Sequence, residues 1–187
     1  MAEGSETVYP IALERSERRW AFVVAAVIAF VFAVIIYSSV HWRAAPPSNV
    51  ETIDASTLHL GGEFMEANLG PQMQADGSVT VRLIAQQYSF VPQCVVLPAG
   101  VRVVFRATSP DVVHGFLIAG TNVNTMVVPG YVAQVSTRFD APGEHAMPCH
   151  EYCSLGHQNM WAWVKVVDRA EFERSYRGPS RATCERQ

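Results

Sequence analysis

The feature that most constrains the fold is an uncharged stretch of 21 residues from Trp20 to Val40. A bilayer core about 30 Å thick needs about 20 helical residues, and a helix pairs all of its own backbone groups there. Trp20 at one border and Tyr37 and Trp42 at the other fit the aromatic belts of a membrane interface. A signal peptide is the alternative, but its apolar region is only about 7 to 15 residues long. The stretch therefore predicts a transmembrane helix over residues 20–42.

Positive charge near the predicted helix indicates its orientation. Three arginines precede the span and only one closely follows it, namely Arg15, Arg18, Arg19 and then Arg43. Because Lys and Arg are retained on the cytoplasmic side, residues 1–19 are expected in the cytoplasm and the larger part of the chain outside. The consecutive prolines Pro46 and Pro47 mark residues 43–50 as a short, stiff linker.

Beyond the linker, the pattern changes to short runs rich in Val, Phe and Tyr, separated by Pro, Gly, Asn and Asp. Apolar residues alternate in VTVRLIA and VRVVFRA, which is the two-residue period of a strand. Further runs cover 114–119, 132–139, 144–147 and 160–167. The sequence predicts a mainly β domain over residues 51–168, built as a two-sheet sandwich with Greek-key connections. A charged tail is expected over residues 169–187, as a solvated helix or coil.

Composition excludes two classes of protein. Fourteen basic residues against 17 acidic ones give a net charge of −3, which lacks the basic surface of a nucleic-acid-binding protein. A chain of 187 residues holds one ordinary domain plus the predicted anchor, so a multidomain enzyme is excluded.

The strongest chemical signal is PCHEYCSLGHQNM, which holds Cys149, Cys153, His157 and Met160 within 12 residues. Thiolate, imidazole and thioether are soft ligands that select copper over hard cations such as magnesium. His114, which follows a Ser-Pro-Asp loop at the start of a predicted strand, is the best candidate for a further ligand. A mononuclear blue-copper site uses one cysteine, so the second cysteine favours two coppers bridged by both sulfurs. Such a pair predicts fast one-electron transfer, whereas catalysis needs an open coordination position.

Three other interpretations of this segment remain open. Cys149 and Cys153 could form a disulfide, which suits an oxidising exterior. The cysteines and histidines could hold a structural zinc ion, which would leave Met160 incidental. Met160, Trp161 and Trp163 could be ordinary core residues of a strand, and this is the preferred interpretation for the two tryptophans.

Three further residues are not expected to bind the metal: Cys94 and Cys184 have no ligand spacing, and the pair His114 and His157 already serves two metals without His150. His150 is expected to face a partner surface rather than a metal. Cys94 and Cys184 are either two separate thiols or a mutual disulfide that ties the tail to the domain.

Four segments between about Val79 and Val167 resemble subunit II of the haem–copper cytochrome c oxidases, namely SPDVVHGF, GTNVNTMVVPG, PGEHAMPCHEYC and GHQNMWAWVKV. The single span and the wording of the first motif look like the B-type members. The resemblance implies a cupredoxin-like Greek-key β-sandwich that carries the dinuclear copper centre CuA. It also implies a location in a bacterial or archaeal cell membrane, with this domain on the periplasmic or extracellular side and subunit I as partner.

The resemblance also assigns the copper ligands. It implies side-chain ligation by His114, Cys149, Cys153, His157 and Met160, and ligation by Glu151 through its backbone carbonyl. In the mitochondrial-like branch, the acid at the Glu151 position also binds a magnesium ion shared with subunit I, which extends the expectation to such an ion here.

The implied function is that of a non-catalytic subunit that takes single electrons from a soluble donor and passes them to haem in subunit I. Oxygen would be reduced to water in that partner. Two alternatives are the CuA subunit of a nitric oxide reductase and a membrane-anchored protein that binds or delivers copper.

Two observations bear on the donor. The aromatic cluster through which electrons enter the two-span relatives is not evident, and the nearest segment, QQYSFVPQ, makes Tyr88 and Phe90 the candidates for that role. Residues 44–167 hold five basic and nine acidic residues, a net of −4, which would attract a basic cytochrome c in a salt-dependent manner. A small copper protein that docks by apolar contact is the other candidate donor.

Overall fold

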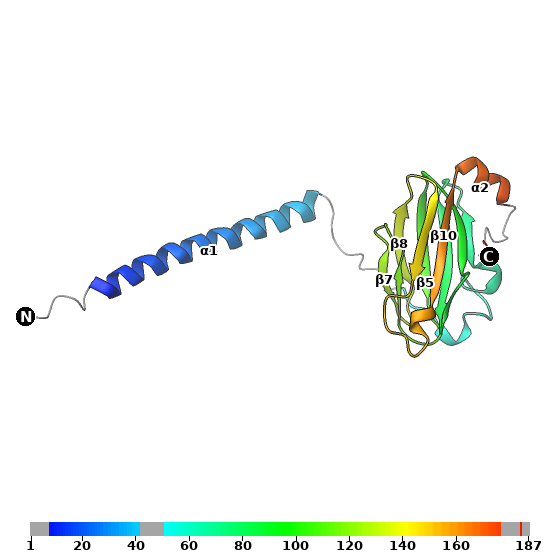
Figure 1. Cartoon of the computed structure of the whole chain (residues 1–187), viewed down its shortest axis with the longest axis horizontal. Helices are drawn as coiled ribbons and strands as arrows, with labels where there is room; N and C mark the ends of the chain where they lie inside the picture. The colour runs from blue at the N-terminus through cyan, green and yellow to red at the C-terminus, as the bar shows by residue number, and fades with distance from the viewer. Residues whose placement is uncertain (1–7, 42–50, 177–183, 185–187) are drawn as a thin grey trace, which may run out of the picture. The chain divides into compact units, whose positions relative to one another are not determined.

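The computed structural model describes residues 8–41, 51–176 and 184, and the chain divides into two units, Met1–Asn49 and Val50–Gln187. The first unit contains the helix α1, Val8–His41 (Figure 1). It begins 12 residues before Trp20, so it includes the charged residues that precede the predicted span. The predicted linker, residues 43–50, lies outside the described residues.

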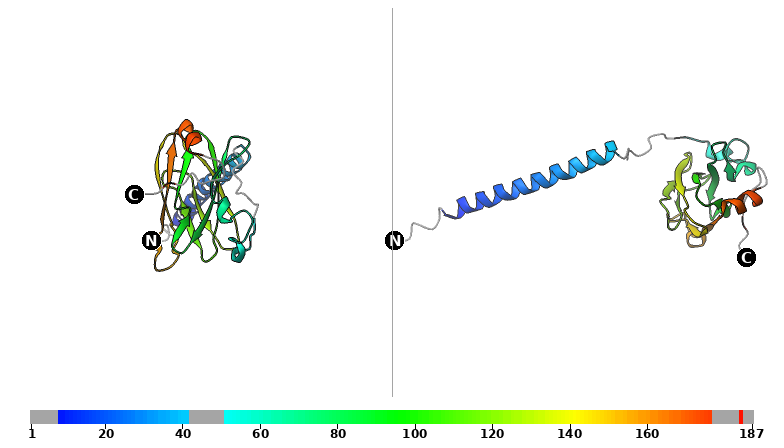
Figure 2. Two further views of the ribbon diagram at one scale, coloured as in Figure 1. Left: turned by 90° about the vertical axis from the view of Figure 1, so that its right-hand side faces the viewer. Right: turned by 90° about the horizontal axis from the view of Figure 1, so that it is seen from above.

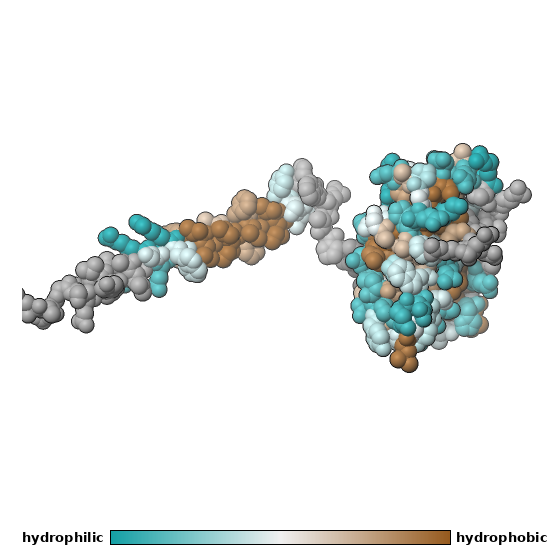
Figure 3. Space-filling view, in the orientation of Figure 1, coloured by the Kyte–Doolittle hydropathy of each residue, from teal (hydrophilic) through white to brown (hydrophobic). Residues whose placement is uncertain are grey.

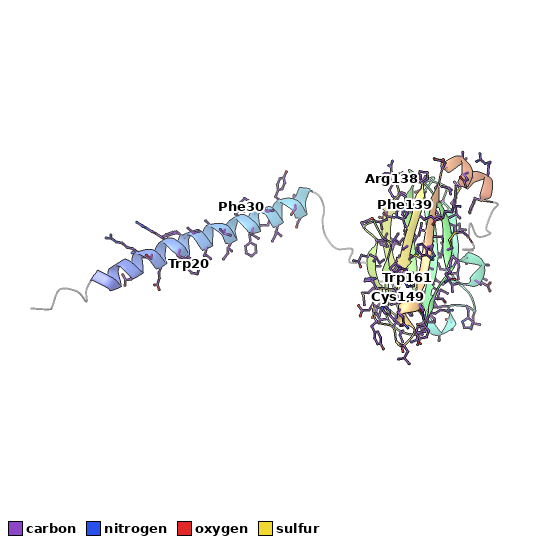
Figure 4. The ribbon with its side chains drawn as sticks, in the orientation of Figure 1. Trp20, Phe30, Arg138, Phe139, Cys149 and Trp161 are labelled. Atoms are coloured by element: carbon purple, nitrogen blue, oxygen red, sulfur yellow. A yellow bond between two sulfur atoms is a disulfide. The ribbon has the colours of Figure 1, made fainter. Side chains whose placement is uncertain are left out.

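Residues Glu14–Val40 of α1 are long and apolar enough to cross a membrane. Figure 3 shows a continuous apolar band along this helix with hydrophilic side chains toward its N-terminal side. Trp20 and Phe30 project from it and are 68% and 69% exposed within the chain (Figure 4). So large an apolar surface fits a helix whose neighbours are lipid or another membrane helix.

The second unit consists mainly of strands. In the described residues they are β1 Gly70–Met73, β2 Val79–Gln86, β3 Ser89–Val91, β4 Cys94–Pro98, β5 Arg102–Thr108, β6 His114–Leu117, β7 Asn124–Val127, β8 Ala133–Arg138, β9 Gly143–Pro148 and β10 Trp161–Val167. Short 3-10 helices cover Ala55–Thr57, Glu66–Asn68 and His157–Asn159, and the helix α2 covers Arg169–Ser175.

The strands form two main sheets and a hairpin. One sheet has the order β1-β2-β5-β8, with β3 paired to β2, the other has the order β4-β10-β9, and β6 pairs with β7. The pairs β2–β5 and β4–β10 are parallel, and the remaining pairs are antiparallel. The strands run along the length of the domain, and Figure 2 gives two further views of them. This architecture confirms the predicted β-sandwich preceded by one apolar helix.

The core lies between the two main sheets. Alternating residues of β2 and β5, such as Val81 and Phe105, share one buried cluster with Val95 of β4 and Val164 of β10. The alternation in the sequence therefore marks the inner faces, as a half-buried strand requires.

Four strands were not predicted: β1, β3, β4 and β7. The strand β4 reads CVVLP and is buried at four of its five positions. It contacts α2 in addition to packing into the core, so its second face is also covered and the alternation disappears. The other three strands are only three or four residues long.

The described part of the tail begins with the helix α2, whose side chains are mostly exposed, but the tail is anchored to the domain at three residues. Phe172 of α2 is fully buried in the core, and the Tyr176 hydroxyl accepts a hydrogen bond from the backbone N–H of Met73 at 3.3 Å. Cys184 forms a disulfide with Cys94 of β4. Of the two alternatives left open for Cys94 and Cys184, the structure therefore has the mutual disulfide, which ties the tail to the domain across 90 positions of sequence.

Ion pairs fix the segment before β1 to the first sheet. Glu63 accepts hydrogen bonds from Arg82 Nε at 2.9 Å and from Arg106 Nη2 at 2.6 Å, and Arg106 Nη2 also donates to Glu51 at 2.6 Å. Burial by itself raises the pKa of Glu63, but the hydrogen bonds and charges of Arg106 and Arg82 outweigh burial and hold that pKa below 4.5.

Candidate metal centre

The predicted ligands come from two segments that meet at one end of the sandwich. His114 begins β6, and residues 149–160 connect β9 to β10. In Figure 4, Cys149 and Trp161 lie at the opposite end of the domain from Arg138 and Phe139. The backbone N–H of Cys149 donates to the carbonyl of Met160 at 3.0 Å and closes the loop at its base.

Two histidines and two cysteines form a compact cluster. The Nδ1 atom of His114 lies 3.9 Å from Cys149 Sγ, which lies 3.8 Å from Cys153 Sγ. The Nδ1 atom of His157 lies 3.7 Å from Cys153 Sγ. The ligand atoms of His114, Cys149 and Cys153 all lie within 4.8 Å of one another, and all three residues are buried. Each sulfur therefore has one imidazole beside it.

Two weaker donors complete the cluster. The Met160 side chain is fully buried, and its Sδ lies 3.8 Å from Cys153 Sγ. The backbone carbonyl oxygen of Glu151 lies 3.2 Å from Cys149 Sγ. The structure thus brings together all six residues predicted as ligands, although their binding of copper stays a prediction.

The spacings and the donor types fit a soft metal ion. Ligand atoms bound about 2.0–2.3 Å from one tetrahedral ion lie about 3.3–3.8 Å apart. The contacts of 3.7–3.9 Å that link the imidazoles, thiols and thioether are within a few tenths of an ångström of that range. Two thiols, two imidazoles and a thioether suit copper or zinc and do not suit magnesium or calcium.

The disulfide interpretation of Cys149 and Cys153 does not hold. Both are free, and their sulfurs lie 3.8 Å apart, whereas a disulfide bond is about 2.05 Å long. Burial, followed by the neighbouring Cys149, raises the pKa of Cys153 to about 11. The thiol is therefore protonated in the metal-free chain, and a metal that binds there must displace the proton.

Asp111 orients the buried His114. Its Oδ1 lies 2.9 Å from His114 Nε2, and its Oδ2 accepts from the backbone N–H of Gln87 at 2.7 Å. Burial raises the pKa of Asp111, but these hydrogen bonds and those of the neighbouring residues more than offset burial and lower it. A carboxylate only accepts, so His114 donates through Nε2 and directs the lone pair of Nδ1 toward Cys149. Sequence reasoning missed Asp111, although its place three residues before His114 was a usable signal.

Two glycines allow the ligand loop to lie close to its neighbours. A Cβ on Gly115 would lie 2.5 Å from the backbone nitrogen of Glu151 and would also meet the His150 ring. A Cβ on Gly156 would lie 2.6 Å from atoms of the Tyr88 ring. At both positions the neighbouring atoms leave no room for a side chain, so glycine is required. His150 is exposed, as expected for a residue that faces outward.

Two sequence expectations near the site are corrected. Phe90 is 1% exposed and packs against Phe116, so it cannot touch a docked donor, whereas Tyr88 is 40% exposed. Trp161 is 44% exposed and is not a core residue. The buried face of β10 is that of Ala162 and Val164, because the strand pairs in the opposite phase to the one expected.

Comparison with known proteins agrees with this architecture. The family model described as "Cytochrome C oxidase subunit II, periplasmic domain" matches residues 77–167. A protein of Thermus thermophilus named "Cytochrome c oxidase subunit 2" is 34% identical over 154 residues, which cover 81% of this chain and 92% of that protein. A second T. thermophilus protein of the same name is 36% identical over 123 residues, or 66% of this chain and 91% of that protein.

A solved structure is similar over much of the chain. It is a chain of a "heme-copper terminal oxidase dimer", with 25% identity and a TM-score of 0.60 over 81% of this chain and 99% of that one. The chain belongs to the cytochrome c oxidase subunit II family.

Proposed function

We propose that the chain is the electron-accepting subunit of a membrane-bound haem–copper oxidase and that residues 114 and 149–160 hold a dinuclear copper centre. The observation that carries the proposal is the pairing of each sulfur with its own imidazole, His114 with Cys149 and His157 with Cys153. When bound by these residues, two coppers would supply reversible one-electron chemistry.

The protein groups around the site suit electron transfer. Cys149, Cys153 and Met160 are almost fully buried, so water is excluded from the sulfurs. The Asp111 hydrogen bond and the closed loop base hold the ligands in position before any metal binds. Preorganised ligands need little movement when charge changes, which favours rapid transfer of single electrons.

The proposed partner subunit would contact both α1 and the β domain. The helix α1 would pack against subunit I in the membrane, where haem receives the electron and oxygen is reduced. The carboxylate of Glu151 is exposed, although its carbonyl faces Cys149, so it would be free to share a magnesium ion with that subunit. Insertion of α1 in the membrane would place the N-terminus in the cytoplasm and the β domain outside.

The surface around His157 supports docking of the donor by apolar contact. The Tyr152 ring lies edge-on to the His157 ring at 5.9 Å and is 70% exposed, and Leu155 is 85% exposed. Tyr88 adds a third partly exposed side chain next to this loop. Figure 3 shows a hydrophobic protrusion at this end of the domain, among mostly hydrophilic surface. Clustered exposed apolar side chains of this kind mark interaction sites in soluble domains.

Metal analysis of the full-length chain in detergent tests the copper proposal. After loading with Cu²⁺ under mildly reducing conditions, we expect two coppers per chain and a seven-line hyperfine pattern in electron paramagnetic resonance. His157→Asn should abolish this pattern. The control His145→Asn should retain it, because the Nδ1 atom of His145 is hydrogen-bonded to the Ala119 carbonyl and not to a predicted ligand. Zinc or a single copper in the wild-type chain would refute the proposal.

Two further measurements separate the alternatives. Co-purified subunits that reduce nitric oxide in place of oxygen would assign the chain to a nitric oxide reductase, and reversible Cu(I) binding without an intense visible band would indicate copper delivery. For the donor, apolar docking predicts that the rate of reduction changes little with ionic strength and falls in Tyr152→Ser. A steep decline with salt would instead assign docking to charge.

A further inference from the structure

The turn between β2 and β3 contacts both segments that carry the predicted ligands. The backbone N–H of Gln87 donates to Asp111 Oδ2 at 2.7 Å, and Asp111 Oδ1 lies 2.9 Å from His114 Nε2. The side-chain amide of Gln87 donates to the carbonyl oxygen of Cys153 at 2.8 Å. One residue is thus bonded to the His114 segment through its backbone and to the Cys153 segment through its side chain.

The segment that Gln87 holds makes mostly internal hydrogen bonds. The carbonyls of Ser154 and Gly156 accept from the backbone N–H groups of His157 and Asn159, both within the loop. Ser154 has φ 108°, a conformation that favours glycine. The backbone is therefore strained at this residue, and contacts outside the residue must hold it in place. The bond from Gln87 to Cys153 therefore connects this half of the loop to the sandwich.

Tyr88 adds a packing contact to the same half of the loop. A Cβ on Gly156 would lie 2.6 Å from atoms of the Tyr88 ring, so the ring lies directly on the backbone that precedes His157. The turn therefore holds the loop at two points, beside one predicted sulfur ligand and beside one predicted imidazole ligand.

We propose that Gln87 is a positioning residue for the metal centre, because its two hydrogen bonds fix the His114 segment and the Cys153 segment relative to each other. The role in metal binding rests on the proposed function. The positioning itself is a property of the metal-free chain and can be measured without copper.

Gln87→Met tests the proposal in the full-length chain in detergent. Methionine has a similar length but no N–H, so the bond to Cys153 is lost while the backbone bond to Asp111 remains. In the metal-free protein, we expect amide hydrogen exchange over residues 153–157 to be about fivefold faster, the usual worth of one hydrogen bond. Gln74→Met is the matched control, because the Gln74 amide donates to the Gln72 carbonyl away from the site and should leave that exchange unchanged.

The copper-loaded protein provides a second readout. Loss of a group that orients a ligand typically weakens metal binding about 10- to 100-fold, so Gln87→Met should release copper to a chelator at least about tenfold faster and alter the hyperfine splitting. Unchanged exchange over residues 153–157 in Gln87→Met would overturn the positioning role whatever metal is bound. If exchange is faster in Gln87→Met but the wild-type chain binds only zinc, the positioning role is supported and the proposed function is refuted.

Discussion

Gly115→Ala is a stringent perturbation of the candidate metal centre, because it changes no predicted ligand. The added methyl group would lie 2.5 Å from the backbone nitrogen of Glu151. It would also meet the His150 ring, but that exposed side chain can rotate away. The backbone of the ligand loop has no such freedom, so it must move.

The size of the movement follows from the same contact. Ordinary van der Waals contact begins at 3.4 Å, so Glu151 must shift by 0.9 Å from the 2.5 Å position. Its carbonyl lies only 3.2 Å from Cys149 Sγ, so the shift disturbs a predicted ligand pair directly. Overpacking of this kind usually costs about 1–3 kcal/mol of unfolding free energy. We expect that loss, together with fewer bound coppers and an altered visible spectrum.

Urea denaturation and copper titration of the full-length chain measure both effects. Gly143→Ala is the matched control, since no atom lies within 4 Å of the position its added methyl group would take and its stability should change by less than about 0.5 kcal/mol. If Gly115→Ala and Gly143→Ala have the same stability, the same copper content and the same spectrum, the close packing of the loop on β6 does not position the metal centre.

Two further predictions concern stability. The double substitution Cys94→Ala and Cys184→Ser removes a cross-link between residues 90 positions apart. It should lower the unfolding free energy by up to about 4.6 kcal/mol. This is an upper value, because the released tail also gains entropy in the folded state. Because the folded pKa of Glu63 lies below 4.5, its pairing with Arg82 and Arg106 stabilises the fold above that pH and is lost as pH falls through the folded pKa. Glu63→Gln should therefore reduce the loss of stability as the pH falls below 4.5.

Urea titrations provide the controls for both. The doubly substituted chain should match the wild type after reduction with a thiol, and equal stability before reduction would contradict the role of the cross-link. Glu144→Gln, which changes an exposed side chain of β9, should leave the acid dependence unchanged. An equal acid dependence in Glu63→Gln and wild type would show that the ion pairs do not contribute.

Local pattern was sufficient for the helix, most strands and the chemistry of the ligands. An uncharged run of 21 residues is long enough to predict a membrane-spanning helix. The alternation of apolar residues in β2 and in β5 indicates which face of each strand is buried. The short spacing from Cys149 to Met160 is enough by itself to place four donors in one loop. These properties depend on neighbours along the chain, so the sequence displays them.

Other properties depend on residues far apart in the chain, and only the tertiary structure decided them. It placed His114 next to Cys149, 35 positions away, and joined Cys94 to Cys184. It buried Phe90, which was expected at the donor surface, and exposed Trp161, which was expected in the core. The physical reason is that strand register and sheet order decide which residues of a strand face the core. Both are determined by pairing between distant segments rather than by local composition.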